Sequence, residues 1–431
     1  MRTPSRDTVV ALFALLVAAW LIASAWPQFK NSLMTFPADA SIDWAGARVL
    51  VEGKNPYDDE NLRRFGMNEE KGLGHPPTAL LWFLPFGNSD VDEMKLAWTI
   101  LTLGWLFLLL MIAVTELQFP WPRVTTLCLF GAVLHTSWMD DHFQMAQLST
   151  LIALLYTLAW QFRRRGRDTL AGISLGLACT LKLFPGVVIL LLLLEKRVRL
   201  AIAAFVTWLA LAAAVTLRIG HLHCWQQFLS QTEWYTRYWM AHIRNGAIQG
   251  IVQRLHYPVC QYGEGLHAVW RTGSIIASLV SLTLIAGAFF LCRRARIDRL
   301  PAAADLSFGT YAVLSLVTNP YVWEHYNVIL LLPFLIALRV AFEAVREPMS
   351  RRDRARGIAG CVGLGVAAVI LSLNVHSKVA LWQKVASSFP PTPAEHARLH
   401  LLEILNWLAP MLILSVLALQ LWLRPRKNPA S

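Results

Sequence analysis

The sequence predicts an all-α, polytopic membrane protein of about twelve membrane segments, and three observations support this fold class. Hydrophobic residues make up 56% of the 431 residues and charged residues only 15%, whereas a soluble domain carries about 25% charged residues. Apolar runs of about 20 residues, each long enough to cross a bilayer, recur along the chain. Lys and Arg gather in the short loops between these runs, as they do in the cytoplasmic loops of membrane proteins.

The same composition excludes several classes of protein. A mean hydropathy of +0.46 is incompatible with an ordinary cytosolic enzyme or a disordered chain. The net charge of +12 lies mainly in the short loops, so it indicates membrane orientation and not binding of nucleic acid. The sequence has neither a metal-ligand spacing of Cys and His nor a nucleotide-binding glycine-rich loop, so we expect no metal and no cofactor.

The basic clusters set the direction of each crossing. We place all of them in the cytoplasm, at 2–6, 163–167, 196–199, 293–299, 346–356 and 424–427. The long connections 27–75, 219–272 and 376–401 then face the exterior, where we expect the protein to act. The predicted spans are 8–26, 77–117, 123–139, 143–161, 200–218, 273–292, 305–319, 325–345, 357–375 and 402–423.

Two of these spans carry qualifications. Pro76-Pro77 and Pro85-Phe86-Gly87 interrupt the second, so a short re-entrant piece is predicted before a true span at 92–116. The first is either a span or a signal peptide, since Ala23-Ser24-Ala25 resembles a cleavage site.

Residues 169–194 are predicted to form a helical hairpin of half depth. Both ends are basic and therefore cytoplasmic, yet about 26 residues are too few for two full spans. The turn falls at Lys182-Leu183-Phe184-Pro185. Because a turn exposed to lipid is forbidden, its tip must be buried in protein or line a polar cavity.

The first external loop is predicted to hold a short helix that begins at Asp43 and ends at Gly53. Trp44, Ala47, Leu50 and Val51 share one face, which is typical of a helix lying on the membrane surface. Asp43 is either the N-cap of this helix or a general base held at the membrane boundary.

Ionisable residues at membrane depth are costly, so Lys182 and the polar stretch 318–327 are further candidates. Lys182 either extends to the outer interface or pairs with Asp140, Asp141 or His142 on the same side. Cys224 and Cys260 share the loop 219–272, where a disulfide can form; spacing alone does not show that they meet.

Several motifs resemble those of glycosyltransferase family 87, which are integral-membrane enzymes of the GT-C type. The loop from Asp43 to Gly53-x-x-Pro56-Tyr57-Asp58 resembles the family's first-loop signature. In order along the chain, four further matches are His75-Pro76-Pro77 with Pro85, Ala146-Gln147-Leu148-Ser149, Gly172 to Gly176 with Lys182-x-x-Pro185, and Asn319-Pro320-Tyr321-Val322-Trp323-Glu324-His325-Tyr326. The sequence departs from the family pattern at His75, Ala146 and Ser149.

The resemblance implies a role for each residue. Asp43 corresponds to the catalytic base, and Lys182 and His325 correspond to groups that bind the phosphate of a polyprenyl-phosphate-sugar donor. We expect further substrate contacts from His75, Gln147, Asn319, Trp323, Glu324 and Tyr57. The chain 1–431 is then one integral-membrane domain with an external catalytic loop at 27–75, a core at 76–335 and C-terminal segments at 336–431.

The expected function is an inverting transfer of a hexose, mannose in most of the family, to a hydroxyl of a glycan or glycolipid acceptor. The partners are the lipid-linked donor, this acceptor and membrane lipid, at the outer face of the cytoplasmic membrane. The alternatives are a transporter or flippase for a lipid-linked or polar solute, and a non-catalytic scaffold in envelope assembly. A repeat of two halves would favour the transporter, and none is evident.

Overall fold

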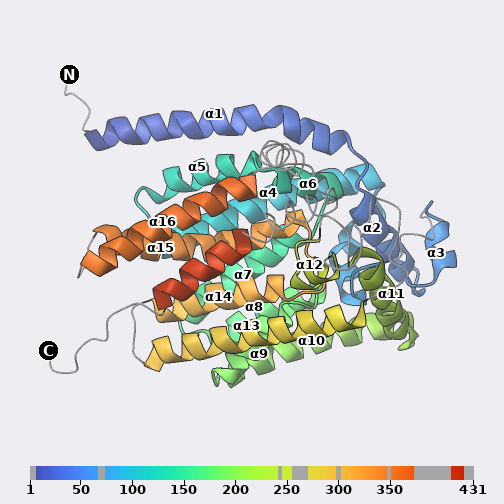
Figure 1. Cartoon of the computed structure of the whole chain (residues 1–431). Helices are drawn as coiled ribbons and strands as arrows, with labels where there is room; N and C mark the ends of the chain where they lie inside the picture. The colour runs from blue at the N-terminus through green and yellow to red at the C-terminus, as the bar shows by residue number, and fades with distance from the viewer. Residues whose placement is uncertain are drawn as a thin grey trace, which may run out of the picture.

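The computed structural model describes residues 6–66, 73–240, 245–254, 270–297, 302–346, 351–372 and 409–421. Every regular element in these ranges is a helix, so the all-α prediction is confirmed there. Figure 1 shows the longer helices side by side as a bundle, with the short helices α2 (Ala38–Val51), α3 (Asp59–Arg63) and α11 (His223–Trp239) together at one end.

Five helices are long and apolar enough to cross a membrane. They are α1 (Arg6–Met34), α4 (Val91–Glu116), α10 (Val198–Ile219), α13 (Arg271–Ile297) and the continuous pair η3 (Glu324–Leu330) and α15 (Leu331–Arg346). The chain is therefore a multi-pass membrane protein. The predicted count of about twelve segments is not confirmed by this set and stays a prediction.

The remaining apolar helices are shorter than a full span. They are α5 (Pro122–Leu134), α8 (Asp168–Leu181), α9 (Gly186–Leu194), α14 (Ala303–Val317) and Ala409–Leu421. Helix α16 (Arg351–Ser372) has 22 residues but is not among the five candidate spans. The small helix α12 (Ile248–Arg254) packs on α13.

The segments predicted at 123–139 and 143–161 have different boundaries in the structure. Thr136 is extended, with φ −79° and ψ 142°, so α5 stops before it and α6 (Ser137–Met145) begins after it. Ala146 then adopts a left-handed conformation with φ 50°, and α7 (Ser149–Arg164) leaves α6 at 112°. If this bent pair is one broken span, the number of candidate spans rises to six. The break brings the end of α6 and Gln147 into the protein interior.

The hairpin predicted at 169–194 is present as α8 and α9. Pro185 cannot continue the first helix, so α8 ends at Leu181 and Lys182 is extended. The two ends meet, because Arg197 after α9 pairs with Asp168 at the start of α8 at 3.5 Å. The tip is covered by η1 (Pro77–Trp82), from which Thr78 Oγ1 donates to the Thr180 carbonyl at 2.8 Å. The prediction that the tip is buried in protein or lines a polar cavity is confirmed, because Lys182 and Phe184 are buried and both line a cavity.

Two glycines of the hairpin allow α8 to pack directly against α10. A Cβ added at Gly172 would lie 2.2 Å from the Leu200 carbonyl oxygen. One added at Gly176 would lie 2.5 Å from the Ala204 carbonyl oxygen. This small-residue spacing, which is common where membrane helices cross, sets the position of α8 and hence of Lys182.

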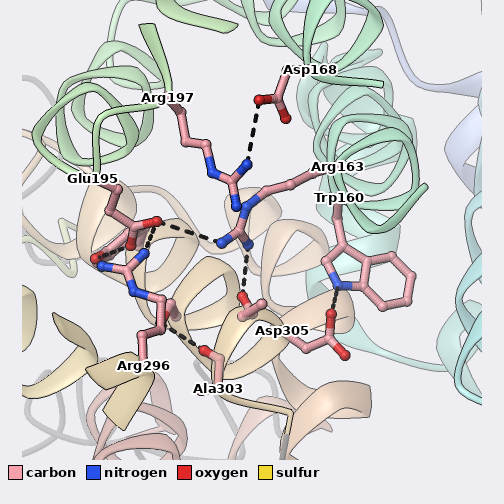
Figure 2. A network of polar contacts seen from close by, with 11 residues as sticks. Trp160, Arg163, Asp168, Glu195, Arg197, Arg296, Ala303 and Asp305 are labelled. Carbon is pink, nitrogen blue, oxygen red and sulfur yellow. Dashed lines mark hydrogen bonds and ion pairs between the residues drawn. The ribbon is translucent and has the colours of Figure 1, made fainter. Parts of the chain in front are cut away.

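Buried charges connect the ends of several helices at the basic end of the bundle (Figure 2). Glu195 pairs with Arg163 at 3.5 Å and with Arg296, and it accepts a hydrogen bond from the Tyr311 hydroxyl at 2.5 Å. The Glu195 side chain is 1% exposed. Arg163, Arg197 and Arg296, one from each of three basic clusters, therefore lie at the same end of the bundle, as the charge pattern predicts. The length of α8, about 21 Å, separates this end from Lys182.

Helix α2 corrects two predictions for the first external loop. It begins at Ala38, directly after Pro37, so Asp43 lies within the helix and is not its N-cap. The face of Trp44, Ala47 and Leu50 packs inside the protein, so it is not the exposed apolar face of a helix that rests on a membrane. The predicted end is confirmed: Gly53 has φ +72° and follows the last turn. The elements η1, η2 (Leu84–Phe86) and α4 pack against the helix, and Trp44 Nε1 donates to the Phe86 carbonyl at 3.2 Å.

Several predictions fall outside the described residues. They include the loop at 376–401 and the basic cluster at 424–427. The pairing of Cys224 with Cys260 is another, because Cys260 lies outside the described ranges while Cys224 is buried.

Candidate active site

A cavity of about 250 Å³ lies at the end of the bundle that carries α2 and α11. Segments far apart in the sequence form its wall: α2, the stretch before η1, the α6–α7 break, the hairpin tip, α11 and the residues before η3. All the predicted site residues line this cavity except Tyr57 and Glu324. They are Asp43, His75, Gln147, Lys182, Asn319, Trp323 and His325.

Asp43 is paired with His75. Nδ1 of His75 lies 2.8 Å and 3.0 Å from the two carboxylate oxygens, and the Asp43 side chain is 4% exposed. An ionised carboxylate only accepts hydrogen bonds, so Nδ1 of His75 is the donor when Asp43 is ionised. The His75 carbonyl in turn accepts a hydrogen bond from the Tyr57 hydroxyl. Tyr57 therefore fixes the backbone of His75 and does not line the cavity itself.

Lys182 enters the cavity from the tip of the hairpin. Its ammonium group donates to the Tyr326 hydroxyl and lies 4.1 Å from the centroid of the same ring. The ring of Phe184 stacks on the ring of Tyr326, with the two ring centroids 5.9 Å apart. Lys182 is 9% exposed, so it is held inside the protein and does not extend to the interface.

His325 reaches the cavity from η3. Its Nδ1 lies 3.0 Å from an Asp141 carboxylate oxygen, which connects η3 to α6. Asp141 is one of three residues predicted to pair with Lys182, together with Asp140 and His142. In the structure Asp141 contacts His325 and not Lys182. Asp140 accepts a hydrogen bond from Ser32 at 2.5 Å on the α1 side, and His142 is fully buried against Thr150.

The rest of the 319–326 motif shapes the wall between α14 and η3. Asn319 Nδ2 donates to the Tyr321 carbonyl at 2.5 Å, which closes a tight turn. Trp323 lines the cavity and packs edge-on against Trp239 of α11. Glu324 is buried behind this wall and faces a smaller neighbouring cavity, so the structure does not bring it to the main one.

The sequence pattern of glycosyltransferase family 87 matches residues 74–320. The chain belongs to glycosyltransferase family 87. As a member of this family it is an enzyme, a hexosyltransferase. The matched range includes His75, Gln147, Lys182 and Asn319, whereas Asp43 lies before it and His325 after it.

Two mycobacterial enzymes are similar to the chain. The polyprenol-phosphate-mannose-dependent alpha-(1-2)-phosphatidylinositol mannoside mannosyltransferase of Mycobacterium tuberculosis is 25% identical over 345 residues, which is 74% of each chain. The enzyme of the same name from Mycolicibacterium smegmatis is 23% identical over 398 residues, covering 87% of this chain and 85% of its relative. No solved structure gives a significant match.

Asp39 lines the cavity although it is not among the predicted site residues. It lies four residues before Asp43 on the same face of α2 and lines the cavity. Its carboxylate accepts a hydrogen bond from Gln147 Nε2. Burial raises the pKa of Asp39 above its usual value, and the nearby His75 and Lys182 partly oppose that rise. The four-residue spacing within one helix was the available signal.

Helix α11 supplies a second set of missed residues. Phe228, Thr232, Tyr235 and Thr236 recur at helical spacing and all line the cavity. Burial raises the pKa of Tyr235, so its hydroxyl stays protonated and can donate a hydrogen bond. The spacing 228, 232, 235 was readable in the sequence, but only the fold shows that it faces the site.

Asn245 joins the segment after α11 to the 319–326 motif. Its side-chain oxygen accepts from the backbone N–H groups of Ala247 at 3.0 Å and Val322 at 2.9 Å. Its Nδ2 donates to the carbonyl of Pro320 at 3.1 Å. Among the described residues, no group of three or more His, Cys, Asp or Glu side chains is arranged to hold a metal ion.

Proposed function

We propose that the enzyme transfers mannose from a polyprenyl-phosphate donor to a hydroxyl of a glycan or glycolipid acceptor. The transfer is a single displacement with inversion, at the outer face of the cytoplasmic membrane. The observation that carries this proposal is that one cavity brings a carboxylate on α2 together with two basic side chains from the hairpin tip and η3.

Asp43 is the general base in this proposal. An acceptor hydroxyl must lose its proton as it attacks the anomeric carbon, and a carboxylate within hydrogen-bond distance can take it. The hydrogen bond from His75 fixes the orientation of the carboxylate, and the Tyr57 hydroxyl fixes His75. The resemblance of the first external loop to the family's signature supports this role for Asp43.

Lys182 and His325 bind the departing phosphate. Negative charge grows on the phosphate oxygen as the bond to the sugar breaks, and preorganised cations or donors stabilise it. The lipid phosphate is itself the leaving group, so no separate acid is required. Tyr326 and Asp141 hold the two side chains in place.

The names of the similar enzymes support the substrates. Both act with polyprenol-phosphate-mannose on a phosphatidylinositol mannoside. A lipid-linked donor suits a site formed between membrane helices, and the gathering of the basic clusters at the far end of the bundle supports an external site.

The purified protein in proteoliposomes, given polyprenyl-phosphate mannose and phosphatidylinositol mannoside, tests the proposal. Mannosylated product is expected from the wild type and not from Asp43→Asn, and NMR of donor and product should show opposite anomeric configurations. Retention of configuration would rule out the single displacement. Movement of intact donor across the bilayer without product would instead support the transporter alternative.

A further inference from the structure

Asp39 has no part in the proposed chemistry, yet its environment is that of a ligand-binding group. It lines the cavity that contains Asp43 and Lys182. The hydrogen bond from Gln147 is the only one that its carboxylate makes within the described residues. Gln147 is 3% exposed, and its Oε1 is buried without a hydrogen-bond partner in the described part of the chain. Buried amide oxygens in this state are uncommon and call for an explanation such as a bound ligand.

Asp39 shares its cavity with the two groups proposed to act on the substrate, the base Asp43 and the phosphate-binding Lys182. On α2 it lies about one turn from Asp43. Asp39, Asp43 and Lys182 all line the cavity, so their charged groups border the same space. Asp39 therefore borders the same cavity as the proposed base and the proposed phosphate-binding cation, one helical turn from the base.

The geometry of a single displacement determines what occupies this position. The anomeric carbon must lie between the attacking oxygen, near Asp43, and the leaving phosphate oxygen, near Lys182. The ring of the transferred hexose then occupies the cavity that Asp39 also lines. A carboxylate accepts hydrogen bonds from sugar hydroxyls, and such charge-assisted bonds are short and strong.

We propose that Asp39, positioned by Gln147, binds ring hydroxyls of the transferred hexose and selects the donor sugar. This inference rests on the proposed function, because it takes the order of base, sugar and phosphate from that reaction. A site built to hydrogen-bond a hydroxyl discriminates strongly against a sugar that cannot supply it, since the buried polar groups are then left unpaired. Asp39 and Gln147 thus recognise the sugar, whereas Lys182 and His325 recognise the phosphate that every such donor shares.

The test compares Asp39→Asn with the wild type in proteoliposomes, using polyprenyl-phosphate mannose and its C2 epimer, polyprenyl-phosphate glucose. The wild type is expected to prefer one donor. Asp39→Asn should lower kcat/KM for the preferred donor at least tenfold and reduce the preference to within about threefold. The KM for the acceptor should change by less than threefold. Asp58→Asn is the matched control, because Asp58 caps α3 outside the cavity and Asn caps a helix equally well.

Binding measurements separate this inference from the proposed reaction. Polyprenyl-phosphate mannose should bind Asp39→Asn at least tenfold more weakly than it binds the wild type, while polyprenyl phosphate without a sugar should bind both equally. Unchanged donor preference and unchanged binding of polyprenyl-phosphate mannose would overturn the inference, as would an equal loss for the sugar-free lipid. A wild type that binds the donor with this pattern but transfers nothing would refute the proposed function alone.

Discussion

The sequence leaves two roles open for Asp43, an N-cap and a general base, and the structure distinguishes between them. The N-cap role is wrong, because α2 begins five residues earlier, at Ala38. Asp43→Asn keeps the shape of the side chain and an oxygen that accepts the hydrogen bond from His75. It cannot take a proton, so we expect a loss of 10²–10⁴-fold in kcat, roughly 3–5 kcal/mol of transition-state stabilisation.

Sugar transfer and thermal unfolding of the purified Asp43→Asn variant check this expectation. The unfolding temperature should stay close to that of the wild type, and Asp58→Asn should retain normal activity. Near-normal transfer by Asp43→Asn would show that another carboxylate is the base, with Asp39 as the first to examine.

Lys182 and His325 should act on the donor far more than on the acceptor. Removing one electrostatic group from such a site typically costs 10²–10³-fold. We expect Lys182→Gln and His325→Gln each to lower kcat/KM for the lipid donor by about this factor. The acceptor KM should change little, as measured by initial rates over both substrate concentrations.

Matched substitutions outside the cavity control for this result. Lys54 lies on the surface, and His135 bonds the Leu21 carbonyl at 2.7 Å, away from the site. Lys54→Gln and His135→Gln should therefore transfer sugar normally. Unchanged donor affinity and turnover in Lys182→Gln and His325→Gln would show that these two side chains only support the fold.

The sequence was informative wherever a local rule and the fold agreed. Pro185 and the length of the apolar run predicted the hairpin, and Gly53 predicted the end of α2. The prediction of where α2 begins was wrong because two residues fit the rules for a helix start. The helix begins directly after Pro37, and Asp43 only resembled an N-cap. The left-handed Ala146 carries no local signal, since alanine rarely adopts this conformation without support from its surroundings.

The contact between α8 and α10 controls where the hairpin tip lies. Gly176→Ala places a methyl group where the Ala204 carbonyl oxygen leaves no room, so α8 must shift against α10. Overpacking of this kind typically costs 1–3 kcal/mol. We expect a lower unfolding temperature and, because Lys182 moves with α8, weaker use of the donor, measured by thermal unfolding and donor titration.

Gly186 offers the control within the same hairpin. It begins α9, and a Cβ added there would meet nothing within 4 Å. Gly186→Ala should leave both stability and donor use unchanged. A Gly176→Ala enzyme that matches it in both measurements would show that the close approach of α8 and α10 does not position the tip.

The orientation of the whole molecule follows from the opposite placement of its cavity and its buried charges. In a Cys-free background, Asp59→Cys and His221→Cys should react with an impermeant maleimide in intact cells, because both positions are exposed near the cavity end. Arg167→Cys, which is exposed at the basic end, should react only after permeabilisation. The reverse labelling pattern would invert the molecule in the membrane and place the reaction in the cytoplasm.

The contact between Lys182 and Tyr326 has a consequence for how the chain is made. These residues are 144 positions apart, so at the usual rate of synthesis Lys182 precedes its partner by roughly 7–30 s. During that interval a charged hairpin tip has no enclosing wall from η3, and a lipid environment is costly for it. The hairpin must therefore wait within the insertion machinery or at the aqueous surface until the later helices arrive. A ribosome-arrested chain ending near residue 300 should accordingly leave Lys182 open to an amine-reactive reagent that cannot reach it in the finished protein.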